Sequence, residues 1–131
     1  MRPNREKIAI PRFGEDVAPC FGASATIAIF ITEDGEIVDQ VDFTLHSQRA
    51  LDRIRLLRDQ EVDTLICGGL QERVEEMIAA AGIRVFSWVA GNAEELLAAY
   101  LRGQLHSRSG PSHPREQQDR GDLSTVKDQK R

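Results

Sequence analysis

The sequence lacks long apolar stretches and has little cysteine. None of its runs approaches the roughly 18 apolar residues that a membrane-spanning helix needs, so we expect no membrane segment. The charged first residues are not followed by an apolar segment, which predicts that there is no export signal. With two cysteines in 131 residues and no such signal, we expect reduced thiols and a cytoplasmic protein.

Common catalytic and nucleotide-binding motifs are also missing. The sequence contains no Walker loop, no GxGxxG, no CxxC and no HExxH. A cysteine–histidine nucleophile pair would need a third residue to orient it, and no motif provides one. The net charge of −4 argues against a general nucleic-acid-binding protein. We therefore expect neither an enzyme nor a protein that binds nucleic acid.

What is present is one domain followed by a polar tail. Residues 1–105 are acidic and hold nearly all of the apolar residues, whereas residues 106–131 are polar and mildly basic. A segment with so few apolar residues cannot offset the entropy that it would lose on ordering. We expect a single α/β domain over residues 1–105 and a disordered tail over residues 106–131.

Apolar periodicity predicts five strands and three helices. The strands are expected at residues 7–11, 25–32, 36–43, 62–67 and 83–88, and the helices at residues 48–60, 70–81 and from Asn92 to near Gly103. Asp34-Gly35 predicts a hairpin turn, Ser47 and Asn92 are expected N-caps, and Gly82 is the expected C′ residue of the second helix.

The order of these elements predicts the fold class. The later alternation of strand and helix favours parallel strands with right-handed crossovers, and the hairpin sets residues 25–32 antiparallel to their neighbours. We expect a three-layer α/β/α sandwich around a five-stranded mixed sheet, with strand two antiparallel.

Three potential metal donors follow strands at what should be one edge of this sheet. In open α/β sheets, ligands bind at the carboxyl ends of the parallel strands. Cys20 lies in the loop after the first strand, His46 after the third, and Cys67 at the end of the fourth, before Gly68-Gly69. Thiolate and imidazole suit iron–sulfur clusters, copper and zinc. The glycines would let a ligand approach the backbone, and the next helix N-terminus favours an anion.

These residues also have purely structural interpretations. Cys67 ends an apolar strand, where a cysteine is often a small buried hydrophobic residue. His46 can serve to hydrogen-bond within a turn, and Trp88 fits core or rim packing better than ligand contact. Cys20 differs from them because its loop, VAPCFGAS, is broken by proline and glycine, so that packing explains it less well.

Six short segments carry a resemblance to a known family. They are residues 7–11 (KIAIP), 17–22 (VAPCFG), 34–38 (DGEIV), 62–70 (VDTLICGGL), 81–85 (AGIRV) and 98–105 (AAYLRGQL). In this order and spacing they make about residues 6–105 resemble the dinitrogenase iron-molybdenum cofactor biosynthesis family. That family includes nitrogenase accessory proteins that carry the cofactor or its precursor, and the orange protein of sulfate reducers.

The resemblance implies an RNase H-like fold and metallocluster binding without catalysis. Many members have a histidine where this sequence has Cys20, so an imidazole donor is replaced by a thiolate donor. Members often carry a histidine just before the first helix, a place that His46 fits. The residues implied in cluster binding are Cys20, Phe21, Gly22, His46, Cys67, Gly68, Gly69 and Leu70. Cys20 would be the main metal ligand, Cys67 and His46 are the further candidate ligands, and the amides of residues 68–70 would cradle the outer atoms of the cluster.

On this basis we expect the protein to bind and carry an iron–sulfur or iron–molybdenum cluster during cofactor biosynthesis or insertion. It would be a monomer that meets a cofactor-assembly or acceptor protein. The alternative is a metal-free interaction or redox-regulatory module on the same fold, in which Cys20 is redox-active or inert.

Overall fold

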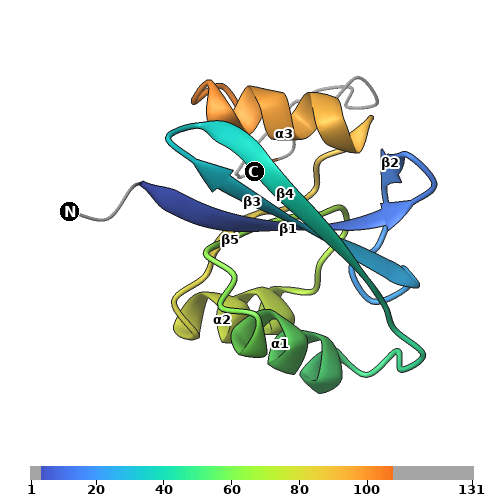
Figure 1. Ribbon diagram of the computed structural model, residues 1–131. Helices are drawn as coiled ribbons and strands as arrows, with labels where there is room; N and C mark the ends of the chain where they lie inside the picture. Colours follow the sequence, from blue (N-terminus) through green and yellow to red (C-terminus); the bar gives the residue numbers. More distant parts are fainter. Residues whose placement is uncertain (1–3, 108–131) are drawn as a thin grey trace, which may run out of the picture.

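A mixed sheet in the order β4-β3-β1-β5-β6 organises residues 4–107, the part of the chain that the computed structural model describes. The strands are β1 (Arg5–Phe13), β2 (Asp16–Val17), β3 (Thr26–Glu33), β4 (Glu36–Thr44), β5 (Thr64–Ile66) and β6 (Arg84–Phe86). The helices are α1 (Ala50–Asp59), α2 (Glu72–Ala80) and α3 (Ala93–Leu101). Helix α3 covers one face of the sheet, and α1 and α2 cover the other (Figure 1). The predicted three-layer α/β/α fold is confirmed.

The predicted strand directions are confirmed as well. Strand β3 is antiparallel to both β1 and β4, and β5 is parallel to both β1 and β6. The carboxyl ends of β1, β5 and β6 therefore lie at the same edge of the sheet, where the loops that follow them can form a common site.

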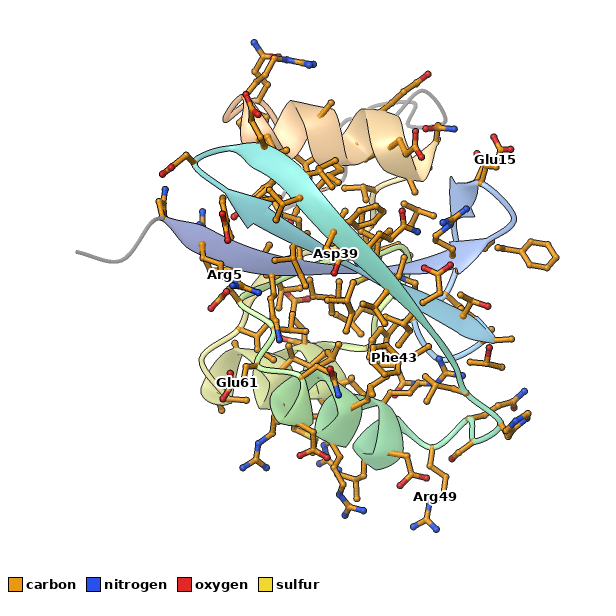
Figure 2. The ribbon with its side chains drawn as sticks, in the orientation of Figure 1. Arg5, Glu15, Asp39, Phe43, Arg49 and Glu61 are labelled. Atoms are coloured by element: carbon orange, nitrogen blue, oxygen red, sulfur yellow. The ribbon has the colours of Figure 1, made fainter. Side chains whose placement is uncertain are left out.

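A sixth strand occupies part of the segment that we expected to be a broken loop. Strand β2 pairs with the end of β1, with Arg12 opposite Val17, through a turn at Gly14 whose φ is 67°. Glu15 lies at the tip of this hairpin (Figure 2). A strand of two residues has no alternating pattern that could be recognised in the sequence, which is why the prediction of five strands missed it.

The apolar residues of the central strands form one core on each face of the sheet. On the side of α1 and α2, the core contains Ala9, Phe21, Ile27, Ile29, Ile54, Leu57, Leu65, Cys67 and Ile78. On the side of α3, it contains Ile8, Ile10, Ala28, Phe30, Ile66, Val89, Leu96 and Leu97. Phe43 of β4 packs against the first core (Figure 2). Because full burial of such side chains contributes about 1.5–3 kcal/mol each, the sheet is a stable frame for the loops at its edge.

Two of the three expected helix-end residues are confirmed. Asn92 caps α3, and its side chain accepts a hydrogen bond at 3.0 Å from an amide of the first turn. Gly82, with a φ of 86°, follows the C-cap of α2. The expectation that Ser47 caps α1 is wrong, because the N-cap is Arg49. Ser47 Oγ instead accepts a hydrogen bond from the Arg49 amide at 3.1 Å and donates to Asp52 at 2.6 Å.

The predicted tail lies almost wholly outside the described residues. Leu105 still packs on the core beneath α3, and residues 108–131 are not described. Within residues 4–107, no helix combines the length and the apolar character needed to cross a membrane.

Candidate functional site

Cys20 lies at the predicted edge of the sheet, beside the segment that follows β5. The Gly69 amide donates a hydrogen bond to the Pro19 carbonyl oxygen at 2.6 Å, and the Phe21 amide donates to the Gly69 carbonyl oxygen at 2.9 Å. These bonds form a parallel bridge between Cys20 and Gly69. The topology thus brings together the two loops that the sequence analysis had placed at one edge.

The loop that carries Cys20 is packed more tightly than its sequence suggested. Val17, Ala18 and Phe21 are at most 5% exposed, and the amides of Val17 and Ala18 each donate to a backbone carbonyl at 2.9 Å. Cys20 itself is exposed. The loop therefore presents its thiol to solvent from a backbone that is anchored on both sides.

Gly68 is needed for the close approach of two backbone segments. A Cβ atom at this position would lie 2.4 Å from the carbonyl oxygen of Ala18 and 2.6 Å from that of Pro19. We had expected Gly68-Gly69 to let a ligand approach the backbone. That expectation is corrected, because the Cys20 loop occupies the space beside Gly68 and the Gly69 amide already has an acceptor in Pro19.

A pocket of about 430 Å³ opens beside Cys20. Its walls come from the Cys20 loop, from the segments at the starts of α1 and α2, and from the loop after β6. The lining residues are Pro19, Cys20, Phe21, Gly22, Ala23, Gln48, Ala50, Gly69, Leu70, Gln71, Val74 and Trp88. None of them is charged, and most are apolar. Five of the eight predicted binding residues, namely Cys20, Phe21, Gly22, Gly69 and Leu70, meet at this pocket.

Cys67 lies in the core rather than in the pocket. It is 0% exposed and packs among the apolar residues beneath α1 and α2. Burial, and secondarily the charge of Glu75, raises the pKa of the Cys67 thiol to about 12, so the thiol is protonated at neutral pH. The structural interpretation of Cys67 is therefore favoured, and its expected role as a metal ligand beside Cys20 is corrected.

His46 lies before α1 and is exposed, but it does not line the pocket. Gln48, two residues further on, is the first residue of that segment to reach the pocket. Among residues 4–107, no group of three or more His, Cys, Asp or Glu side chains could hold a metal ion. The expectation that Cys20, His46 and Cys67 gather as one ligand set is therefore wrong.

Trp88 is a pocket residue that the sequence analysis assigned to packing. It is 44% exposed, and its φ of 62° lies in the left-handed region that bulky residues rarely adopt. Its ring lies against Gly69, where an added Cβ atom would be 3.3 Å from Cζ3 of the indole. The available indication was its position at the carboxyl end of the last parallel strand, at the same edge as Cys20.

The fold and the pocket define the class of this protein. It is an α/β/α domain with a mixed sheet and an exposed thiol in an apolar pocket at the carboxyl edge of its parallel strands. The chain belongs to the dinitrogenase iron-molybdenum cofactor family, whose model matches residues 5–103. A comparison with curated proteins gives no significant match.

Solved structures share this fold. A Methanocaldococcus jannaschii protein provisionally named a dinitrogenase is 15% identical, with a TM-score of 0.66 over 85% of this chain and 100% of that one. A Thermotoga protein provisionally named a NifB protein is 25% identical, with a TM-score of 0.60 over 78% and 92% of the two chains. The orange protein of Desulfovibrio gigas, in its apo form, is 20% identical, with a TM-score of 0.59 over 88% and 100%. These likenesses establish the fold.

Proposed function

We propose that this protein binds a metallocluster of the iron–sulfur or iron–molybdenum type and carries it to a cofactor-assembly or acceptor protein. The observation that carries the proposal is the exposed Cys20 thiol in an apolar pocket, in a chain of the dinitrogenase iron-molybdenum cofactor family. The cluster is cargo in this proposal, and the protein is a cytoplasmic monomer.

One soft donor in an apolar pocket suits a cargo that has to be released. Cys20 as the thiolate can form one metal–sulfur bond, which is the bond that iron–sulfur clusters prefer. Because Cys20 is the one His, Cys, Asp or Glu residue that lines the pocket, the other metal positions keep ligands that the cargo brings. A single bond to the protein can then be exchanged for a ligand of the acceptor.

We further propose that the protein is not an enzyme. Acid–base and nucleophilic catalysis need a partner group within hydrogen-bonding reach of the reacting atom. The pocket residues include neither a charged side chain nor an imidazole that could act as such a partner for Cys20. This composition supports binding and carriage.

The test compares Cys20→Ala with Cys67→Ala after anaerobic purification and anaerobic reconstitution with iron and sulfide. Metal analysis and the visible absorption spectrum measure the cluster content. We expect the parent and Cys67→Ala to take up a cluster, and Cys20→Ala to lose most of this uptake. Equal uptake by Cys20→Ala and the parent would show that Cys20 is not the ligand.

The second candidate is a metal-free interaction or redox-regulatory module. The observation that favours it is that Cys20 is the one exposed thiol within residues 4–107, and that no other Cys, and no His, Asp or Glu, lines its pocket. A redox module would contain no metal when isolated without air, and its Cys20 thiolate would exchange with added glutathione disulfide, forming a mixed disulfide and releasing one glutathione thiol. Mass spectrometry of the anaerobically isolated protein separates the two candidates.

A further inference from the structure

A buried positive charge lies behind the Cys20 loop. Arg53 of α1 is 1% exposed and is the largest of the fully buried side chains among the described residues. Burial lowers the pKa of its guanidinium group, but arginine remains protonated in proteins. A positive charge is therefore buried on α1, close to the segment before this helix that forms one wall of the pocket.

The guanidinium group of Arg53 holds the segment that follows Cys20. Nη1 donates hydrogen bonds to the Phe21 carbonyl oxygen and to Ser24 Oγ, both at 3.2 Å. Nη2 donates to the Ser24 carbonyl oxygen at 2.6 Å and to the Ser47 carbonyl oxygen at 3.2 Å. Arg53 thus links the Cys20 loop to the segment that leads into α1, and both of these segments line the pocket.

No carboxylate forms an ion pair with this cation within residues 4–107. All four of its acceptors are neutral, and Nε is buried without any hydrogen-bond partner. Asp52, its neighbour in sequence, accepts a hydrogen bond from Ser47 instead. The one ion pair in the same range joins Arg5 to Glu33. A buried charge without a counter-charge is unfavourable for folding, so stability alone does not explain Arg53.

We infer that Arg53 gives the Cys20 pocket a positive potential and thereby makes it prefer anionic ligands. Arg53 does not line the pocket, so its charge acts on a ligand there from a distance, across the Phe21–Ser24 segment to which it donates hydrogen bonds. Its charge is screened less than that of an exposed residue, because the side chain is 1% exposed and water and salt do not reach it directly. The positive potential at Cys20 is a property of the protein and does not depend on the proposed function. The statement that the anionic ligand is a metallocluster does rest on that function.

The potential can be measured with two alkylating reagents of similar size and different charge. Iodoacetate is an anion and iodoacetamide is neutral. In both reactions the Cys20 thiolate forms a sulfur–carbon bond, the carbon–iodine bond breaks, and iodide leaves. Cys67 is fully buried, so the folded protein should take up a single adduct. The ratio of the two rates reports the potential at Cys20, because changes in thiol reactivity or accessibility affect both rates alike.

The variants are Arg53→Met, Arg53→Lys and a matched control, Arg55→Met, which removes an exposed charge from the same helix. We expect Arg53→Met to lower the iodoacetate-to-iodoacetamide ratio by about three- to tenfold at low salt. Arg53→Lys should keep most of the ratio, since it keeps the charge. Arg55→Met should change the ratio less than about twofold, because water and salt screen an exposed charge. A purely structural role of Arg53 would move both rates together and leave the ratio unchanged.

A second measurement needs no variant and covers the case in which Arg53→Met does not fold. The ratio at Cys20 in the folded parent should exceed the ratio at Cys20 in the same chain unfolded in urea, where peptide mass spectrometry separates it from that of the newly exposed Cys67, although the net charge of −4 would by itself lower the folded ratio. A parent ratio at or below the unfolded value would overturn the inference, as would an unchanged ratio in folded Arg53→Met. If the ratio depends on Arg53 but the parent takes up no cluster, the proposed function is wrong and this inference stands. If the parent takes up a cluster but the ratio does not depend on Arg53, this inference is wrong and the proposed function stands.

Discussion

The polar groups at the two ends of the parallel strands differ in their hydrogen-bond partners. At the amino ends, the Glu6 carboxylate accepts hydrogen bonds from the hydroxyl groups of Tyr100 and Thr64. The Arg84 guanidinium lies 5.7 Å from the ring centre of Phe86 and 5.8 Å from that of Tyr100. At the carboxyl ends, Arg53 is buried among neutral acceptors, and the Cys20 thiol is exposed.

This difference separates a structural network from a candidate binding site. A pocket of about 460 Å³ borders the amino ends, but its polar groups already bond to one another, which lowers the gain from binding a ligand. At the carboxyl ends, the buried Arg53 guanidinium bonds only to neutral acceptors and leaves Nε unpaired, and the Cys20 thiol is exposed. The volume of a pocket therefore does not identify the candidate binding site, whereas a buried charge without a counter-charge beside an exposed thiol does.

The largest effect is expected from Gly68→Ala, which places a side chain where the backbone of the Cys20 loop contacts Gly68. The new Cβ atom would lie 2.4 Å and 2.6 Å from two backbone oxygens, so the loop has to move. We expect a loss of about 3 kcal/mol in the free energy of unfolding, measured by urea denaturation. Gly22→Ala is the control, because no atom lies within 4 Å of its added Cβ. Similar losses in both variants would show that the junction at Gly68 is not a tight contact.

The second effect concerns the buried thiol and depends on pH. The pKa of Cys67 is raised from 9.0 to about 12 in the fold, so below pH 9 the thiol is protonated in both the folded and the unfolded state. Above pH 9 only the unfolded state ionises, and the stability falls until the pH passes about 12. The expected loss from this group is about 2 kcal/mol at pH 10.5. Urea denaturation of the parent and of Cys67→Ala from pH 8 to 10.5 measures it, and parallel curves would contradict the assignment.

The third effect concerns the hydrogen bonds that join Glu6, Thr64 and Tyr100 at the amino ends of the parallel strands. Tyr100→Phe removes a donor to Glu6 and should lower the free energy of unfolding by about 1 kcal/mol. The loss should shrink in a Glu6→Gln background, because the same interaction is already weakened there. The alkylation ratio at Cys20 should not change in either variant. A changed ratio would mean that the two ends of the sheet are electrostatically coupled and that our comparison is wrong.

The sequence was sufficient for the frame of this protein. The apolar runs of the central strands and the helical spacing of Ile54 and Leu57 predicted the layers correctly, and the order of strands and helices predicted the strand directions. Leu51, which the same spacing placed on the apolar face, is 53% exposed. Asn92 was identified as a cap because a side-chain cap is a local feature. Ser47 shows the limit of such local rules, because its hydroxyl bonds to Asp52 and to the Arg49 amide outside the helix.

The site was predicted only in part, because its chemistry depends on long-range packing. The position of Cys20 followed from topology, but the burial of Cys67 depends on how the helices cover the sheet. Arg53 resembled any polar residue of an amphipathic helix, and nothing local showed that the helix would turn it inward. Its partners Phe21 and Ser24 lie about thirty residues away in the sequence.

The smallest effect on stability is expected at the residue that matters most for the proposed function. Cys20 is exposed, so its side chain contributes little to the core, and Cys20→Ala should change the free energy of unfolding by less than about 0.5 kcal/mol. Cys67→Ala is the matched comparison, because the same substitution at a fully buried position should cost about 1–2 kcal/mol. Urea denaturation at pH 7 under reducing conditions measures both variants. A cysteine that supports the fold would lose stability and cluster uptake together, whereas a ligand at an anchored surface loop should lose uptake alone. A stability loss at Cys20 equal to that at Cys67 would place Cys20 in the structural framework and remove the contrast between the two thiols.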